Sequence, residues 1–222
     1  MQQAAPDINE LADRLVGPAA RFDGKSQRVA VKLYRLLAEG SPVPLARLAN
    51  ALNLPVETVS EILSRHATFS DGQGAIIGFG GLTVAEMLPH RFQVEGRRLY
   101  TWCAWDSLFI PGILGKPADV TSRDPLTHTP ISMTVAPDGV TDIRPQGAVV
   151  SFLAPDRTFD RDVIANFCRF VHFFSAPETG GAWTADHPGT FLLSVEDAFM
   201  LGQLTNARRF GDALTTGAHG ES

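Results

Sequence analysis

The sequence predicts an α+β protein in which a winged-helix-like helical domain precedes a larger α+β domain with a mostly antiparallel sheet. Two observations lead to this fold class. Apolar residues recur at helical spacing through the first third of the chain, and short strand-like runs separated by turn residues follow from about residue 81. We therefore expect two domains, residues 1–80 and residues 81–222. A chain of 222 residues is long enough for both.

The first domain is predicted to contain helices followed by a strand–turn–strand unit. Val29, Leu33, Leu36 and Leu37 share one face of a helix. Pro55 suits the first turn of a later helix, where its missing N–H needs no partner. The predicted elements are a helix over residues 29–37 that ends at Gly40, helices over 44–52 and 56–66, a turn cluster at 70–74 and a strand at 75–79.

The second domain, which carries both cysteines, is predicted to alternate strands, turns and a few helices. Ser194 and Asp197 resemble a capping pair at the start of the last helix. Residues from Thr215 onward are expected to fray. The predicted strands are 91–94, 97–101, 118–121, 131–135, 140–143 and 148–152, and the predicted helices are 104–114, 160–166 and 194–214.

The bulk composition limits the classes of partner. A net charge of −5 and a pI near 5.6 argue against nucleic acid or an anionic membrane as the main partner. Residues 1–7 lack the basic start and apolar core of a signal peptide. No run approaches the roughly 20 apolar residues of a membrane helix. We therefore expect a cytoplasmic protein, and the acidic, ordinary surface composition favours a monomer.

Three residues in apolar surroundings carry the chemistry of this chain. Cys103 and Asp106 lie three positions apart in an aromatic run, and the only other cysteine, Cys168, lies far downstream. Either cysteine alone is more often a packed core residue than a ligand. Together, two free thiols and one carboxyl group suit a soft, thiol-seeking metal whose chemistry also needs a proton. The histidines show no metal-ligand spacing: His66, His90, His128, His187 and His219 are scattered, and His172 reads as a hydrogen-bonded core histidine.

The spacing of Cys103 and Asp106 predicts different roles for the two groups. If Cys103 opens the helix, both side chains share one face, and the helix N-terminus lowers the pKa of the thiol. Carboxylate is a poor ligand for soft metals, so Asp106 is better suited to moving protons. Burial among Trp102, Trp105 and Phe109 is expected to raise the pKa of this carboxyl group, because desolvation penalises its charged form.

The segment 98–106, followed by Phe109-Ile110-Pro111, closely resembles the signature of the organomercurial (alkylmercury) lyases. A second signature covers residues 166–168 and 171–174. The resemblance extends to residues 76–79, 81–83, 194–199 and 201–203 and thus to nearly the whole chain beyond about residue 25. Each short motif is weak alone, whereas both cysteine motifs in order, with the Cys-x-x-Asp spacing intact, are specific.

This resemblance implies an enzyme of mercury resistance and detoxification that cleaves carbon–mercury bonds by protonolysis. It maps the catalytic roles onto Cys103, Asp106 and Cys168, which would also be the residues around mercury as substrate or product. It implies no organic cofactor and no resident metal, since mercury arrives with the substrate. The expected partners are an organomercurial, small cytosolic thiols that remove Hg(II), and a mercuric reductase. The family fold, a winged-helix-like domain joined to an α+β catalytic domain, agrees with the reading from the residues.

Tyr100, Trp102 and Phe167 flank the reactive residues and are candidates for the pocket of the organic group; core packing is the alternative. Many family members carry an additional cysteine in the loop where this chain has Asp124, and another beside the second catalytic cysteine, where it has Arg169. We expect activity to survive, with less inhibitory capture of mercury.

Three other functions are compatible with parts of the sequence. A mercury- or copper-sequestering protein would use the two thiols but needs no proton donor such as Asp106. A winged-helix regulator would read DNA, yet residues 55–66 offer Glu57 and Glu61 against Arg65 alone. A redox dithiol enzyme is disfavoured because the cysteines lie far apart and no Cys-x-x-Cys occurs.

Overall fold

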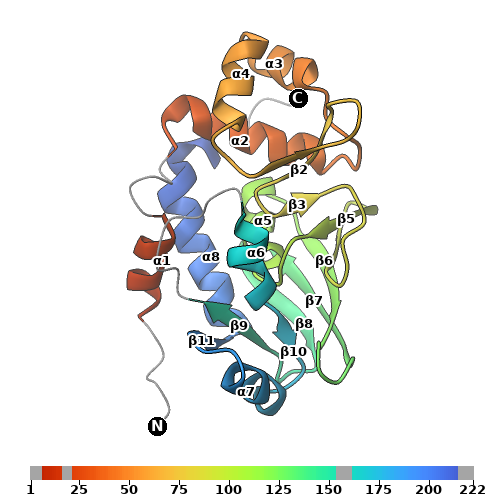
Figure 1. Cartoon of the computed structure of the whole chain (residues 1–222), viewed down its shortest axis with the longest axis vertical. Coiled ribbons are helices and arrows are strands. Elements are labelled where there is room, and N and C mark those ends of the chain that lie inside the picture. The colour runs from red at the N-terminus through yellow and green to blue at the C-terminus, as the bar shows by residue number, and fades with distance from the viewer. Residues whose placement is uncertain (1–6, 17–21, 154–161, 215–222) are drawn as a thin grey trace.

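The computed structural model describes residues 7–16, 22–153 and 162–214. A helix-turn-helix unit lies at one end of the molecule, and the long C-terminal helix runs beside the larger of two sheets (Figure 1). The α+β fold class is confirmed. No helix within the described ranges is both long and apolar enough to cross a bilayer. The predictions for residues 1–6, 160–161, His219 and the frayed end from residue 215 fall outside these ranges.

The helical unit has the predicted order with shifted ends. Pro55 is the N-cap of its helix and not part of the first turn, and residues 64–66 form a turn and not the last helical turn. Asp23 caps the longest helix of the unit by accepting a hydrogen bond from the Ser26 N–H at 2.7 Å. The helices are α1 (Ile8–Val16), which was not predicted, α2 (Gly24–Leu37), α3 (Leu45–Leu52) and α4 (Val56–Leu63).

One antiparallel sheet of eight strands runs through both halves of the molecule in the order β1-β2-β3-β5-β4-β6-β7-β8. The short strand β3 pairs with β2 on one side and with β5 on the other, so the β1–β2 hairpin, which is the wing of the helix-turn-helix unit, is continuous with the rest of the sheet. The strands are β1 (Thr68–Ser70), β2 (Ile76–Phe79), β3 (Leu82–Thr83), β4 (Arg91–Val94), β5 (Arg97–Thr101), β6 (Ala118–Arg123), β7 (Pro130–Ala136) and β8 (Gly139–Arg144).

A second antiparallel sheet places β9 (Val149–Leu153) between β10 (Phe173–Phe174) and β11 (Thr190–Ser194). The last helix was predicted to reach residue 214, but Gly211 adopts a positive φ of 47° and ends it. Ser194 caps this helix as predicted, since its hydroxyl accepts from the Asp197 N–H at 2.9 Å. The remaining elements are α5 (Asp106–Leu114), α6 (Val163–Asn166), η2 (Cys168–Phe170), α7 (Pro177–Ala185), α8 (Val195–Phe210) and η3 (Gly211–Leu214).

Helix α5 lies between α8 and the large sheet and is buried along almost its whole length. A Cβ atom added to Gly202 would lie 2.6 Å from the Cβ of Phe109, so only glycine permits this approach of the two helices. The indole N–H of Trp105 donates to the Ala198 carbonyl at 2.9 Å, and the Asn206 amide donates to the Phe109 carbonyl at 2.8 Å. These contacts fix α5, and with it the Cys-x-x-Asp segment.

Asp124 is a fully buried carboxylate that joins two distant segments. It accepts hydrogen bonds from the N–H groups of Leu126 and Thr127 in its own turn. It also accepts from the N–H and hydroxyl of Ser175 and from the hydroxyl of Thr179, each at 2.8 Å. Burial opposes the charged form, but these hydrogen bonds outweigh it and lower the pKa of Asp124 to about 2.

Replacing Asp124 with alanine is expected to lower the free energy of unfolding by at least about 3 kcal/mol, because several buried donors lose their acceptor. The lowered pKa means that the stabilisation is present above about pH 4 and is lost as the pH falls through about 2. Urea unfolding of both proteins measures the difference. Glu86→Ala, at an exposed carboxylate, is the matched control. Equal losses in the two variants would contradict the role of Asp124.

Candidate active site

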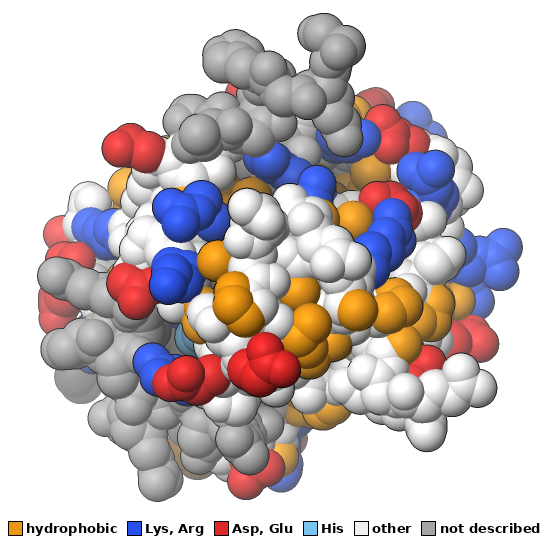
Figure 2. Space-filling model, turned by 90° about the horizontal axis from the view of Figure 1, so that it is seen from above, with side chains coloured by type: hydrophobic (Ala, Val, Ile, Leu, Met, Phe, Trp, Pro, Cys, Tyr) orange, Lys and Arg blue, Asp and Glu red, His pale blue; other side chains and the backbone are white. Residues whose placement is uncertain are grey.

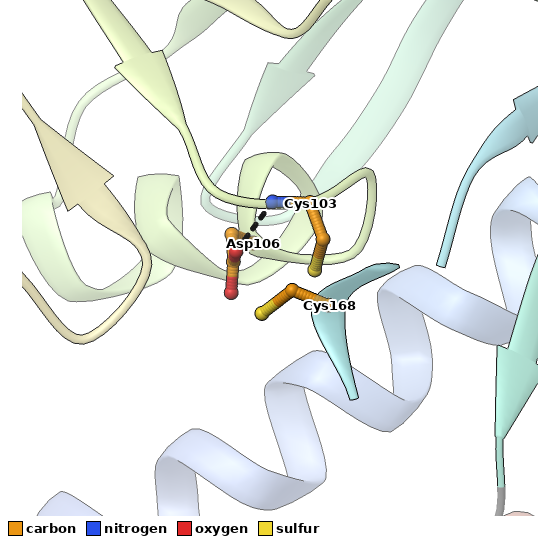
Figure 3. A group of neighbouring side chains, drawn as sticks. All are labelled: Cys103, Asp106 and Cys168. Carbon is orange, nitrogen blue, oxygen red and sulfur yellow. Dashed lines mark hydrogen bonds between the residues drawn. The ribbon is translucent and has the colours of Figure 1, made fainter. Parts of the chain in front are cut away.

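Two thiols and a carboxyl group from distant parts of the chain meet in one buried cluster. The Sγ atoms of Cys103 and Cys168 and a carboxylate oxygen of Asp106 all lie within 4.8 Å of one another. Figure 3 shows Cys168 reaching toward the other two side chains from the facing segment. Their exposed fractions are 0% for Cys103, 4% for Cys168 and 6% for Asp106. The expected proximity of the three groups is thus confirmed.

The turn before α5 fixes Cys103 and Asp106 relative to each other. The predicted start of the helix was two residues too early: α5 begins at Asp106, and Cys103 lies in the preceding turn. The Asp106 Oδ2 accepts a hydrogen bond from the Cys103 N–H at 2.8 Å (Figure 3). Asp106 is the first residue of α5, so its side chain reaches back past the helix start to accept from an N–H group of the preceding turn. The hydroxyl of Thr101 donates to the Cys103 carbonyl at 3.1 Å and further fixes the turn.

Backbone contacts bring Cys168 to this turn. Cys168 begins η2, a single tight turn that follows α6. The Ala104 N–H donates to the Val171 carbonyl at 3.2 Å and links the two cysteine segments directly. Ser151 on β9 donates its hydroxyl to the Phe170 carbonyl at 2.8 Å and accepts from the His172 N–H at 3.0 Å. The second sheet therefore holds Cys168 opposite Cys103.

The Cys103 thiol is less acidic than predicted, and the Cys168 thiol is also less acidic than an ordinary cysteine. Burial is the main effect that raises the pKa of Cys103 well above its ordinary value, and the neighbouring Cys168 and Asp106 raise it further. For Cys168, the hydrogen bond with Cys103 lowers the pKa most, but burial and the charge of Asp106 together raise it above the ordinary value. The prediction of a thiolate favoured by the helix N-terminus was wrong, because desolvation exceeds the effect of the dipole.

The carboxyl group of Asp106 is easy to protonate, as predicted. Burial raises its pKa to about 7, against the hydrogen bonds from Cys103 and the charge of Arg209, which lower it. At neutral pH the acid and the carboxylate are therefore both populated. The cluster combines two neutral thiols with a group that can take up a proton and release it again.

The three candidate pocket residues are buried near the cluster. Tyr100 is the fourth residue of β5, and Phe167 lies between α6 and η2, 5.3 Å from the ring of Phe152. Trp102 lies 4.9 Å from the ring of Phe69 on the wing, and its indole N–H is buried without a partner among the described residues. These positions fit both core packing and a pocket lining, so the pocket assignment stays a prediction.

None of the histidines in the described part of the chain belongs to the cluster. The Nε2 of His172 lies 2.8 Å from the Arg169 carbonyl, and the Nδ1 of His90 lies 2.9 Å from the Ser122 hydroxyl. Among the residues that the structure describes, Cys103, Asp106 and Cys168 form the one group of three that could hold a metal ion.

Sequence reasoning assigned no role to three residues behind Asp106, although Gly81 lies in a segment that resembles the family. Gly80 and Gly81 form a turn that approaches its carboxyl group, and Tyr34 on α2 donates to the Gly80 carbonyl at 2.6 Å. The available signal was the pair of adjacent glycines between two strand-like runs, which marks a turn that needs positive φ. Nothing in the sequence linked this turn to Asp106.

Comparisons with known proteins agree with this geometry. The sequence model of the family described as "Alkylmercury lyase" matches residues 83–205, and that described as "Helix-turn-helix domain of alkylmercury lyase" matches residues 8–80. The chain is 46% identical to an alkylmercury lyase of Pseudomonas putida over 78% of this chain and 81% of the relative. It is 44% identical to an alkylmercury lyase of Streptomyces lividans over 81% of this chain and 83% of the relative.

A solved structure supports the same fold. The mercury-bound form of MerB2 superposes with a TM-score of 0.72, at 22% sequence identity, over 90% of this chain and 97% of that one. The family match covers more than half of the chain, and the curated relatives align over most of its length. This chain therefore belongs to the alkylmercury lyase family.

Proposed function

We propose that this enzyme cleaves the carbon–mercury bond of an organomercurial by protonolysis, with Cys103 and Cys168 as the mercury ligands and Asp106 as the proton carrier. The observation that carries the proposal is the buried cluster itself, in which two sulfurs and one carboxylate oxygen lie within 4.8 Å of one another. Two thiolates supply the soft ligands that mercury prefers, and the carboxyl group supplies the proton.

Cys168 makes the first bond to mercury in the proposed reaction. It is the slightly more exposed thiol, and the Cys103 thiol hydrogen-bonds to Asp106. The Cys168 sulfur binds mercury in R–Hg–X, and X leaves with the thiol proton as HX. The Cys103 sulfur then binds mercury while its proton passes to the Asp106 carboxylate. Protonated Asp106 gives this proton to carbon, the carbon–mercury bond breaks, and R–H leaves Hg(II) bound by both sulfurs.

The resting protonation states suit this sequence. Both thiols have raised pKa values, so they are uncharged until mercury binds, and metal binding then drives their deprotonation. An acid with a pKa of about 7 accepts the thiol proton and still releases it to a developing carbanion. The electron-rich sulfurs weaken the carbon–mercury bond from the metal side.

The proposal needs no organic cofactor and no resident metal, because mercury enters with the substrate. Hg(II) held by two thiolates leaves by exchange with small thiols, and a mercuric reductase is the proposed acceptor of the ion. A cytoplasmic, monomeric enzyme is part of the same proposal.

The regulator hypothesis finds little support on the helix-turn-helix side of the molecule. Figure 2 views this end and shows Lys and Arg interspersed with Asp and Glu, with hydrophobic side chains between them. Arg65 of the would-be recognition segment is paired with Glu61 at 2.6 Å, and Arg47 is paired with Glu39 at 2.6 Å. Phosphate binding would have to compete with these carboxylates.

Replacing Asp106 with alanine is expected to leave Hg(II) binding within a few fold of wild type and to slow hydrocarbon release by at least about 100-fold, because the proton carrier is gone. The assay incubates the protein with phenylmercury and excess thiol and measures benzene in the headspace. Cys168→Ser, which removes a ligand, is expected to lose both properties. Undiminished benzene release by Asp106→Ala would refute the proton route, and loss of Hg(II) binding would assign Asp106 to the metal.

Asp106→Asn is expected to stabilise the fold in a pH-dependent manner. The folded pKa of about 7 lies above the unfolded value, so wild-type stability is highest at low pH and falls as the pH rises through about 7. Asparagine keeps an acceptor for the Cys103 N–H and does not titrate. The variant should gain on the order of 4 kcal/mol over wild type above pH 7 and almost nothing near pH 4. Urea unfolding across this range tests the prediction, and a constant difference would contradict it.

A further inference from the structure

The turn between β2 and β3 lies directly behind the proton carrier. Gly80 and Gly81 form this turn, with φ values of 53° and 104°, a region that side-chain-bearing residues rarely adopt. The Gly81 carbonyl accepts a hydrogen bond from the Trp102 N–H at 2.9 Å, immediately before Cys103. The turn is therefore attached to the reactive segment.

Gly81 leaves the space that the Asp106 carboxyl group occupies. A Cβ atom on Gly81 would lie 2.5 Å from the Cγ of Asp106 and 3.0 Å from its Cβ, and closer still to Oδ1. The other oxygen, Oδ2, accepts from the Cys103 N–H at 2.8 Å. The carboxyl group thus accepts from a backbone donor at Oδ2 and closely approaches a glycine without a side chain at Oδ1, which restricts its rotation. Figure 3 shows the hydrogen bond from Cys103.

Tyr34 fixes the turn from the helical unit. Its hydroxyl donates to the Gly80 carbonyl at 2.6 Å, and a Cβ atom on Gly80 would lie 3.0 Å from the Tyr34 Cζ. The ring is 4% exposed and meets Phe79 and Phe210 edge-on, at centroid distances of 5.2 Å and 6.3 Å. A rigid side chain on α2 therefore sets where the glycine turn lies.

We infer that Gly81 and Tyr34 are positioning residues for the reaction: the glycine turn, held by the tyrosine hydroxyl, keeps the Asp106 carboxyl group where it can take the thiol proton and pass it to carbon. The inference rests on the proposed role of Asp106 and deepens it. It also gives the helix-turn-helix unit a task in catalysis, since Tyr34 belongs to that unit. We expect changes at these positions to act on the carboxyl group and to leave the two sulfurs able to bind mercury.

Gly81→Ala tests the inference through a split between chemistry and binding. An alanine side chain would displace the carboxyl group. A misplacement of about 1 Å in a catalytic group costs on the order of 100-fold in rate. We expect kcat for benzene release from phenylmercury to fall about 100-fold. KM, and the dissociation constant of Hg(II) measured by competition with a small dithiol, should stay within about threefold of wild type.

Gly74→Ala is the matched control. Gly74 has a similar positive φ of 81°, lies in the turn before β2, and a Cβ atom there would meet nothing within 4 Å. This variant carries the same backbone strain without approaching Asp106, so it should keep wild-type kcat. Equal losses of kcat in both glycine variants would reduce the effect to strain and overturn the inference. Wild-type kcat in Gly81→Ala, or loss of Hg(II) binding in parallel with kcat, would also overturn it.

Tyr34→Phe provides a second test that does not depend on the folding of the glycine variant. It removes only the hydroxyl that holds Gly80, and kcat should fall about 10-fold, the effect of one lost hydrogen bond, with Hg(II) affinity unchanged. Wild-type kcat would overturn the role of Tyr34. The proposed function and this inference fail in different ways. If the proposed function is wrong, Asp106→Ala remains active. If only this inference is wrong, Asp106→Ala is inactive while Gly81→Ala and Tyr34→Phe are fully active.

Discussion

The hydrogen bond from the Cys103 N–H to Asp106 Oδ2 is the constraint on which the active site depends. Burial disfavours a charged carboxyl group, and this hydrogen bond holds that group beside the Cys103 thiol. The same bond sets the geometry of the turn before α5. An acid in bulk water would titrate at its usual pH and exchange its proton with solvent. Here the protein backbone replaces water as the donor, so one oxygen is occupied and the other is left for proton transfer. The rest of the fold excludes water from this short turn and holds it in position.

Burial of two thiols and a carboxyl group favours a soft, thiol-seeking metal over a hard cation. The two thiols and the Asp106 carboxyl group are all held more easily in their neutral forms, because burial penalises their charged forms more than the nearby hydrogen bonds and Arg209 stabilise them. A hard cation such as Mg²⁺, which sheds its water reluctantly and prefers several oxygen ligands, finds little here. A soft metal that forms strong bonds to sulfur can displace the thiol protons and enter. In the proposed reaction, exclusion of water by burial would also keep the proton on Asp106 until it is transferred to carbon.

Much of this fold and site could be predicted from the sequence, for reasons that differ by element. Strands β4 and β5 have their predicted bounds because a Glu95-Gly96 turn separates two clear strand runs. The active-site trio followed from the rarity of cysteine and the spacing to Asp106. Helix α7 was not predicted because two adjacent glycines interrupt its helical spacing of apolar residues. Strand β11 was not predicted because α8 follows it with no turn residues between them. The pKa of Cys103 and the contact of Gly81 with Asp106 depend on long-range packing, which local patterns do not encode.

The shared sheet has a consequence for any attempt to dissect the molecule. Strand β3 is paired on both sides, with β2 and with β5. Cutting the chain near residue 80 would remove β2 and leave one edge of β3 without a partner. Unpaired N–H and C=O groups would then face water next to apolar side chains, which is the arrangement that promotes association between copies. A shortened chain that keeps every reactive residue would therefore be prone to aggregate.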